Sequence, residues 1–238
     1  MGETGPVRAP AKLTVSLRIT GVEPDGYHLL DCEMVTVDLA DELEFSDGDG
    51  LAVTGPAVVG VPSSEDNLVR RALVAVGRTA YVRLVKHIPA GAGLGGGSAD
   101  AAAVLRWACE ADLALAASLG ADVPFCLVGG RARVRGVGEV VEPLPFEERT
   151  FTLVTPPLGV STPAVYAAWD ELGGPAGDNG NDLEAAALSV APDLSHWRDG
   201  LAAATGLRPR LSGSGGTWFV EGAFPGEDRI VVRTVPGG

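Results

Sequence analysis

Residues 89–98 form a glycine-rich segment, Pro-Ala-Gly-Ala-Gly-Leu-Gly-Gly-Gly-Ser, in which five of the ten residues are glycine. A stretch typical of a strand precedes it at 81–88, and an alanine-rich stretch typical of a helix follows it. This order is typical of an anion site, because bare backbone N–H groups and the positive end of the helix dipole approach phosphate together. We therefore expect residues 89–98 to bind phosphate, with the helix beginning at a capping Ser98.

Two familiar phosphate loops can be compared with this segment. A Walker A loop requires Gly-Lys followed by Ser or Thr, and the chain contains no Gly-Lys pair. Gly91, Gly93 and Gly96 match the dinucleotide fingerprint by spacing. However, the region upstream does not open a βαβ unit, and Glu110 and Asp112 come too early to follow a second parallel strand. The sequence excludes the first loop and supports the second only weakly.

Lysine is rare in this chain. Of the 18 basic residues, only Lys12 and Lys86 are lysines, and the others are arginines. An ammonium is a compact point charge that a guanidinium does not replace, so each lysine is a candidate for a specific role. The alternative is chance, with Lys12 an ordinary charge on an edge strand.

The chain has 238 residues and a formal charge of −13. This charge argues against a nucleic-acid surface, which needs clustered cations, but it allows an anionic small molecule in a local positive pocket. No apolar run approaches the roughly 20 residues that cross a bilayer. Residues 1–6 have neither the charged nor the apolar region of a signal peptide. We expect a cytoplasmic protein without nucleic-acid or membrane partners.

The cysteines point to the same compartment. Cys32, Cys109 and Cys126 are odd in number and widely spaced, and no Cys-x-x-Cys pair or Cys/His cluster has zinc-binding spacing. We therefore expect reduced thiols, no disulfide and no metal site built from protein ligands.

Apolar periodicity and the placement of glycine and proline predict mixed strands and helices. We expect strands at 12–19, 35–39, 43–45, 51–53, 81–88, 125–128, 151–155, 208–212, 217–220 and 229–235, and helices at 65–76, 98–110, 113–119, 182–190 and 194–204, with a further helix capped by Thr162 ahead of Pro163. This order is typical of an α+β fold. A boundary near 145–150 would divide the chain into an N-terminal lobe, 1–148, and a C-terminal lobe, 149–238.

Residues 89–102 resemble the phosphate loop of the small-molecule kinases that include galactokinase, homoserine kinase and mevalonate kinase. Further segments resemble, in the right order, one branch of that superfamily, which phosphorylates a methylerythritol linked to cytidine diphosphate. They are Ala-Pro-Ala-Lys-Leu at 9–13, Pro-Asp-Gly-Tyr-His at 24–28, Glu-Asp-Asn-Leu at 65–68, Leu-Gly-Ala-Asp-Val-Pro-Phe at 119–125 and Ser-Gly-Ser-Gly at 212–215. The resemblance covers about residues 9–220.

The resemblance implies the two-lobed α+β kinase fold of that superfamily, with ATP and substrate between the lobes. The implied reaction is ATP- and Mg²⁺-dependent phosphorylation of the substrate's 2-hydroxyl, in non-mevalonate isoprenoid precursor synthesis, by a monomer or homodimer. Lys12 and Asp122 match the catalytic pair. Asp122 would accept or orient the hydroxyl proton, and Lys12 would keep that carboxylate ionised and offset charge on the transferring phosphoryl group.

The resemblance also implies which residues bind the two ligands. Those expected to hold ATP are Asn67, Leu68, Lys86, Pro89, Gly91, Gly93, Leu94, Gly95, Gly96, Gly97 and Ser98. Those expected to contact the substrate are Thr14, Tyr27, His28, Thr162 and Tyr166, with Tyr27, His28 and Tyr166 at the cytosine. Stacking combined with hydrogen bonds to the base edge suits a neutral base, and Tyr and His supply both.

The sequence departs from the family pattern and leaves alternatives open. Thr14 stands where the family usually has Asn, Gly216 stands where Pro usually follows Gly-Ser-Gly, and the stretches before Leu119 and after Glu184 are short. Asp122 could merely cap a turn, and residues 212–215 could form a second phosphate-adjacent loop or a plain hairpin. The rival functions are a kinase of the same superfamily acting on another alcohol, and an idle nucleotide-binding relative.

Overall fold

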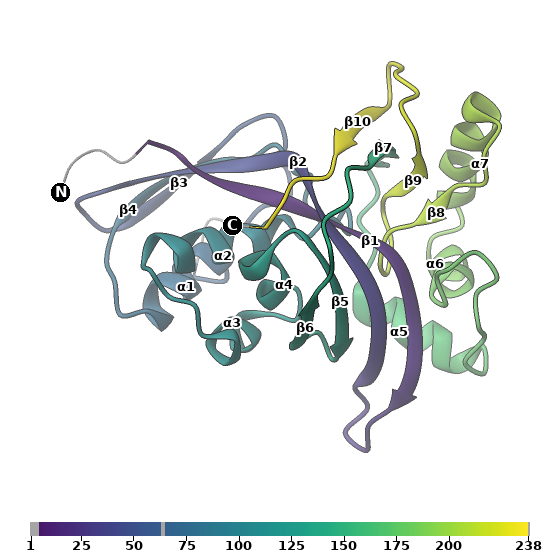
Figure 1. The fold of residues 1–238 in the computed structure, drawn as a ribbon, viewed down its shortest axis with the longest axis horizontal. Helices are drawn as coiled ribbons and strands as arrows, with labels where there is room; N and C mark the ends of the chain where they lie inside the picture. Colours follow the sequence, from purple (N-terminus) through teal and green to yellow (C-terminus); the bar gives the residue numbers. More distant parts are fainter. Residues whose placement is uncertain (1–4, 63–64, 238) are drawn as a thin grey trace.

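Two long antiparallel strands run through the centre of the molecule (Figure 1). The computed structural model describes residues 5–62 and 65–237. Strand β1 (Val7–Val22) ends in the predicted turn, where the Gly26 N–H donates to the Glu23 carbonyl at 2.9 Å, and β2 (His28–Ser46) returns alongside it. The prediction of separate strands at 35–39 and 43–45 was wrong, because β2 runs on through Asp41, whose buried carboxylate finds partners inside the fold.

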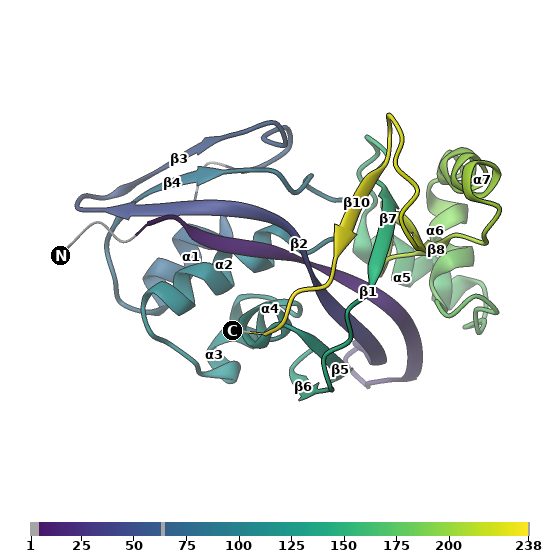
Figure 2. The ribbon, with the colours of Figure 1, turned by 45° about the horizontal axis from the view of Figure 1, so that its top comes forward.

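The first sheet is built around β2. Its strand order is β3-β4-β2-β5-β6, and β1 also pairs with β2. The added strands are β3 (Gly50–Thr54), β4 (Tyr81–Val85), β5 (Arg131–Gly136) and β6 (Val140–Pro143). One side of this sheet is covered by α1 (Leu68–Ala75), α2 (Gly96–Trp107), α3 (Leu113–Leu119) and α4 (Val123–Val128), as Figures 1 and 2 show. Alanines let α2 approach β1 closely, and residues 99–105 of this helix are all buried.

The second sheet has the order β10-β7-β9-β8 and is wholly antiparallel. Its strands are β7 (Thr150–Val154), β8 (Arg210–Leu211), β9 (Trp218–Glu221) and β10 (Ile230–Arg233). The helices α5 (Thr162–Glu171), α6 (Glu184–Val190) and α7 (Leu194–Thr205) lie at its end of the molecule (Figure 2). Mixed strands and helices in this arrangement confirm the predicted α+β class.

The two sheets share a hydrophobic core. Leu13 and Val15 of β1 pack in one cluster with Phe151 of β7 and Phe219 of β9. Since side chains alternate along a strand, this packing turns Lys12 and Thr14 to the other face of β1. The predicted lobe boundary at residue 148 separates the strands of the first sheet from those of the second. However, residues from both sides of the boundary pack in the shared core, so the division into two lobes stays a prediction.

Three local predictions were wrong. Residues 125–128 are helical and belong to α4, because Pro124 suits a first helical turn, and an apolar run this short does not distinguish a strand from a buried helix. Helix α2 begins at Gly96, with Gly95 (φ 67°) rather than Ser98 at its N-cap. In α5 the capping side chain is Ser161, which accepts from the Ala164 N–H at 3.4 Å.

Within the described ranges, no helix is long and apolar enough to span a membrane.

Candidate active site

The glycine-rich segment leaves β4, turns back and enters α2, as the sequence predicts. Gly91, Gly93 and Gly95 have φ of 71°, 75° and 67°, a backbone region that favours glycine. A Cβ at Gly93 would lie only 2.5 Å from the Gly215 carbonyl oxygen. On the same side, the Thr217 hydroxyl donates to the Ala92 carbonyl at 2.6 Å. Residues 212–217 therefore both connect β8 to β9 and pack directly on the glycine loop.

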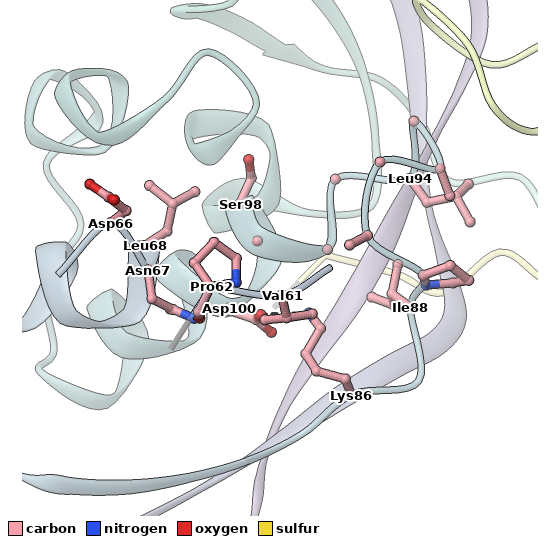
Figure 3. A pocket seen from close by; sticks show the side chains of 18 residues that line it. Val61, Pro62, Asp66, Asn67, Leu68, Lys86, Ile88, Leu94, Ser98 and Asp100 are labelled. Carbon is pink, nitrogen blue, oxygen red and sulfur yellow. Dashed lines mark hydrogen bonds and ion pairs between the residues drawn. The ribbon is translucent and has the colours of Figure 1, made fainter. Parts of the chain in front are cut away.

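A cavity of about 370 Å³ opens between the glycine loop and the residues that lead into α1 (Figure 3). All the residues predicted to hold the nucleotide line it: Asn67, Leu68, Lys86, Pro89, Gly91, Gly93, Leu94, Gly95, Gly96, Gly97 and Ser98. Asn67 is also the N-cap of α1, where its side chain accepts from the Val69 N–H at 2.9 Å and donates to the Pro62 carbonyl at 2.6 Å. These bonds hold one wall of the cavity in place.

Lys86 lines this cavity, and its ammonium lies between two buried carboxylates. Its ammonium pairs with Asp41 and donates to Asp100 at 2.6 Å. Asp41 in turn accepts from the backbone N–H groups of His87 and Ile88, at 2.5 and 2.9 Å, where the chain enters the glycine loop. The charge of Lys86 is thus paired with carboxylates inside the protein, and the predicted contact of Lys86 with the nucleotide stays a prediction.

Sequence reasoning missed both carboxylates of this buried cluster, although each is an acidic residue within an apolar element. Asp100 is 2% exposed, and its Oδ1 has no hydrogen-bond partner among the described residues. Burial raises the pKa of the Asp100 carboxyl to about 7, although the charge of Lys86 opposes this rise. Because the folded pKa exceeds the ordinary value of 3.8, Asp100 retains its proton in the folded state over a wider pH range than in the unfolded chain.

A second cavity, of about 660 Å³, lies on the other side of the glycine loop. The predicted catalytic and substrate residues all line it: Lys12, Thr14, Tyr27, His28, Asp122, Thr162 and Tyr166. Gly93 and Ser98 line both cavities, so the two spaces meet at the glycine loop. This arrangement suits two ligands that react with each other.

Lys12 is held where the cavities meet. Its ammonium lies 3.2 Å from an Asp122 carboxylate oxygen and donates to the Thr14 hydroxyl at 3.0 Å. The lysine side chain is 6% exposed and the aspartate 32%, which rules out an edge-strand charge for Lys12. Asp122 occupies the N-cap position of α4 without a side-chain capping bond, so it does not serve as a turn cap.

The backbone around Lys12 is equally close. The Lys12 N–H donates to the Leu94 carbonyl of the glycine loop at 3.0 Å. A Cβ at Gly95 would lie 2.7 Å from Lys12 Cγ, so glycine is needed there.

Cys32, which lines the second cavity, is not available as a nucleophile, because burial raises the pKa of its thiol to about 12.

Aromatic and imidazole rings gather at the far end of this cavity. The His28 and Tyr166 rings lie 4.7 Å apart, the Trp169 ring lies 5.5 Å from His28, and Tyr27 is 64% exposed. His28 Nε2 also lies 2.9 Å from Asp170 Oδ1. Sequence reasoning missed Trp169 and Asp170, although both follow Tyr166 at helical spacing and so share its face of α5.

Thr162, at the opposite end of α5, connects this helix to the loop after β8. Its hydroxyl lies 2.7 Å from that of Ser214. The first turn of α5 therefore contacts the same 212–217 segment that packs on the glycine loop.

The fold and these paired cavities define a small-molecule kinase, and comparisons with known proteins agree. Residues 67–130 match the family model described as GHMP kinases N terminal domain. A solved mevalonate kinase from L. major, 14% identical, has the same fold with a TM-score of 0.68 and alignment over 98% of this chain and 96% of its own.

Full-length relatives narrow the family. The chain is 42% identical to 4-diphosphocytidyl-2-C-methyl-D-erythritol kinase of Cereibacter sphaeroides, over 89% of this chain and 87% of the relative, and 42% identical to that of Paracoccus denitrificans, over 89% and 84%. A crystal structure of 4-(cytidine 5'-diphospho)-2C-methyl-D-erythritol kinase is 34% identical, with a TM-score of 0.76 over 98% of this chain and 99% of its own. The chain belongs to the 4-diphosphocytidyl-2-C-methyl-D-erythritol kinase family, and this membership implies ATP as its phosphoryl donor.

Substituting Gly93 should loosen the junction of the two loops. We expect Gly93→Ala to lower the free energy of unfolding by at least about 2 kcal/mol, because the new Cβ meets backbone oxygens and the φ is unfavourable for alanine. Gly97→Ala is the control: its Cβ would only touch Leu68 at 3.4 Å, and alanine favours a helix. Urea unfolding without nucleotide measures both, and equal stability of the two variants would contradict this packing.

Asp100 should make stability depend on pH. The unfolded chain releases this proton near pH 4 and the folded protein near pH 7, so the stabilisation is complete below about pH 4 and is lost as pH rises through 7. Over that window the free energy of unfolding of the wild type should fall, relative to Asp100→Asn, by up to about 1.4 kcal/mol per pH unit. Denaturant unfolding of both proteins at several pH values tests this. A constant difference, or one of opposite slope, would show that Asp100 is not held protonated.

Proposed function

We propose that this protein transfers the γ-phosphoryl group of ATP to the 2-hydroxyl of 4-diphosphocytidyl-2-C-methyl-D-erythritol, a step of non-mevalonate isoprenoid precursor synthesis. One observation carries the proposal: two cavities meet at Gly93 and Ser98, and the Lys12–Asp122 pair lines the acceptor side. The names of the relatives supply the substrate. The cavities supply separate places for donor and acceptor.

The donor cavity positions the phosphates. The N-terminus of α2 and the open backbone of the glycine loop offer N–H groups, and the helix dipole favours negative charge at that end. Phosphoryl transfer depends chiefly on positioning and charge neutralisation. The loop is suited to both, because its contacts with residues 212–217 hold it in shape.

On the acceptor side, the substrate 2-hydroxyl must lose its proton. The substrate 2-hydroxyl oxygen forms a bond to the γ-phosphorus while the bond from that phosphorus to the β–γ bridging oxygen breaks, and ADP leaves. The hydroxyl proton passes to Asp122. Lys12, held by Asp122 and Thr14, offsets the negative charge on the transferring group. Thr14 thus supports Lys12 even though it lacks the amide of the usual Asn.

Magnesium is part of the proposal. The described residues contain no group of three or more His, Cys, Asp or Glu side chains placed to hold a metal. Mg²⁺ in nucleotide sites is usually held by one or two carboxylates together with substrate phosphates, so no such group is required. The Ser98 hydroxyl, which lines both cavities, is an oxygen donor that fits this role beside the phosphates. The ion would neutralise phosphate charge when bound.

The far end of the acceptor cavity suits a nucleobase. Tyr27 and Tyr166 offer aromatic faces for stacking on cytosine, and His28 offers a ring nitrogen to its edge. Mevalonate, homoserine and galactose have no base to stack, so these rings favour the cytidylyl substrate over other alcohols.

We also propose a cytoplasmic monomer or homodimer with lobes at 1–148 and 149–238, whose partner is the small-molecule substrate rather than a nucleic acid or a membrane. Cys32, Cys109 and Cys126 form no disulfide in the described part of the chain, which is compatible with a reducing compartment.

The direct test is ADP release from ATP–Mg²⁺ with the cytidylyl substrate, beside mevalonate, homoserine and galactose. We expect turnover with the cytidylyl substrate alone. Turnover with another alcohol would assign a different kinase activity. Nucleotide binding without turnover on any substrate would identify an idle relative.

Asp122 should be needed for turnover but not for nucleotide binding. We expect Asp122→Asn to lower kcat at least about a hundredfold, because the amide cannot accept the hydroxyl proton, and to leave ATP affinity within about twofold. Asp112→Asn is the matched control, since Asn still caps α3 and this residue lies outside both cavities. Steady-state kinetics and calorimetric ATP titration measure both effects. A variant at position 122 with most of its activity would remove Asp122 as the proton acceptor.

A further inference from the structure

We propose that Asp170 is a positioning residue that makes the acceptor cavity select cytosine over uracil by fixing the tautomer of His28. This inference rests on the proposed function, since it concerns the base of the same substrate. Neither the sequence motifs nor the comparisons assign a role to Asp170.

The His28 ring is held in one orientation. Its side chain is 9% exposed and packs against Tyr166 at 4.7 Å and Trp169 at 5.5 Å, with the Trp169 ring edge-on at 81°. Its Nε2 lies 2.9 Å from Asp170 Oδ1. Three residues of α5 thus contact one imidazole, which leaves it little freedom to rotate.

The Asp170 contact determines where the ring proton lies. An ionised carboxylate only accepts hydrogen bonds, so Nε2 must carry the proton that it donates. In neutral imidazole the other nitrogen, Nδ1, is then an acceptor. Nδ1 has no hydrogen-bond partner among the described residues, and the ring lines the cavity. It is therefore the ring atom available to a ligand.

An acceptor at this place distinguishes the two pyrimidines. Cytosine carries a 4-amino group, which donates, whereas uracil carries a carbonyl oxygen at the same position, which accepts. A uracil would set two acceptors against each other and leave both unpaired, and such a mismatch discriminates more strongly than a missing contact. The cavity should therefore prefer the cytidine nucleotide.

The contact of Asp170 with His28 contributes little to the stability of the fold. The Asp170 side chain is 50% exposed, and a polar contact with this exposure contributes little to the free energy of folding. Asp170→Ala should therefore fold, which allows its effect on the tautomer to be measured. Asp170→Asn replaces the carboxylate by an amide, which can donate as well as accept, so it should no longer fix the tautomer. Glu171→Ala removes an exposed carboxylate next in the chain and serves as the matched control.

The tautomer can be observed without any turnover. The chain has only three histidines, so long-range ¹H–¹⁵N spectra of the labelled protein resolve each ring, and His28→Gln assigns the signal. We expect the neutral Nε2–H form of His28 in the wild type and Glu171→Ala, and a mixture of tautomers in Asp170→Ala and Asp170→Asn. An unchanged tautomer in Asp170→Ala, or an imidazolium in the wild type at assay pH, would overturn the proposal.

Discrimination is measured with cytidine and uridine diphosphates, titrated by calorimetry with a saturating non-hydrolysable ATP analogue. We expect the wild type to prefer the cytidine nucleotide about tenfold or more, and Asp170→Ala to lose most of this ratio. In turnover, Asp170→Ala should raise KM for the cytidylyl substrate with kcat within about twofold.

Equal ratios in the wild type and Asp170→Ala would refute the role of Asp170. Absence of turnover by the wild type would instead refute the proposed function, and the spectra and the binding ratio would still decide the role of Asp170.

Discussion

The contact between Lys12 and Asp122, 3.2 Å apart where two cavities meet, is the interaction on which the rest of the site depends. A nearly buried ammonium is costly unless it is paired and hydrogen-bonded. Asp122 supplies the charge and the Thr14 hydroxyl supplies a further hydrogen bond. The N–H of Lys12 donates to a carbonyl of the glycine loop, so any shift of that loop would also move the Lys12 ammonium. In the proposed function, binding of phosphate and activation of the acceptor would thereby be linked through one residue.

The glycine loop is supported from two sides. Above it, residues 212–217 approach so closely that a side chain at Gly93 would collide with their backbone. Below it, the buried Lys86 joins Asp41 of β2 to Asp100 of α2, and Asp41 holds the first N–H groups of the loop. Both supports come from segments far away in the sequence. Because both sets of contacts hold the loop, a segment with so many glycines keeps one conformation.

The sequence predicted the fold class and most elements, because the apolar alternation along β1 and the placement of glycine and proline are local properties. Each residue that it predicts to bind a ligand lines one of the two cavities, and the roles of these residues stay predictions. It failed at α4, where a short apolar run does not reveal its periodicity, and within β2, where the apolar residues predicted two short strands and the structure has one that continues through Asp41. Asp100 and Asp170 were missed for a common reason: their partners, Lys86 and His28, lie on other elements, and only the tertiary fold brings them together.

The central claim is that donor and acceptor occupy the two cavities and react at their junction. A crystal structure with a non-hydrolysable ATP analogue and the cytidylyl substrate tests it most directly. We expect the triphosphate along the glycine loop, its γ-phosphate beside Ser98 and Lys12, and the substrate 2-hydroxyl within about 3.2 Å of an Asp122 oxygen. A triphosphate bound outside the glycine loop, or a 2-hydroxyl directed away from Asp122, would contradict the account.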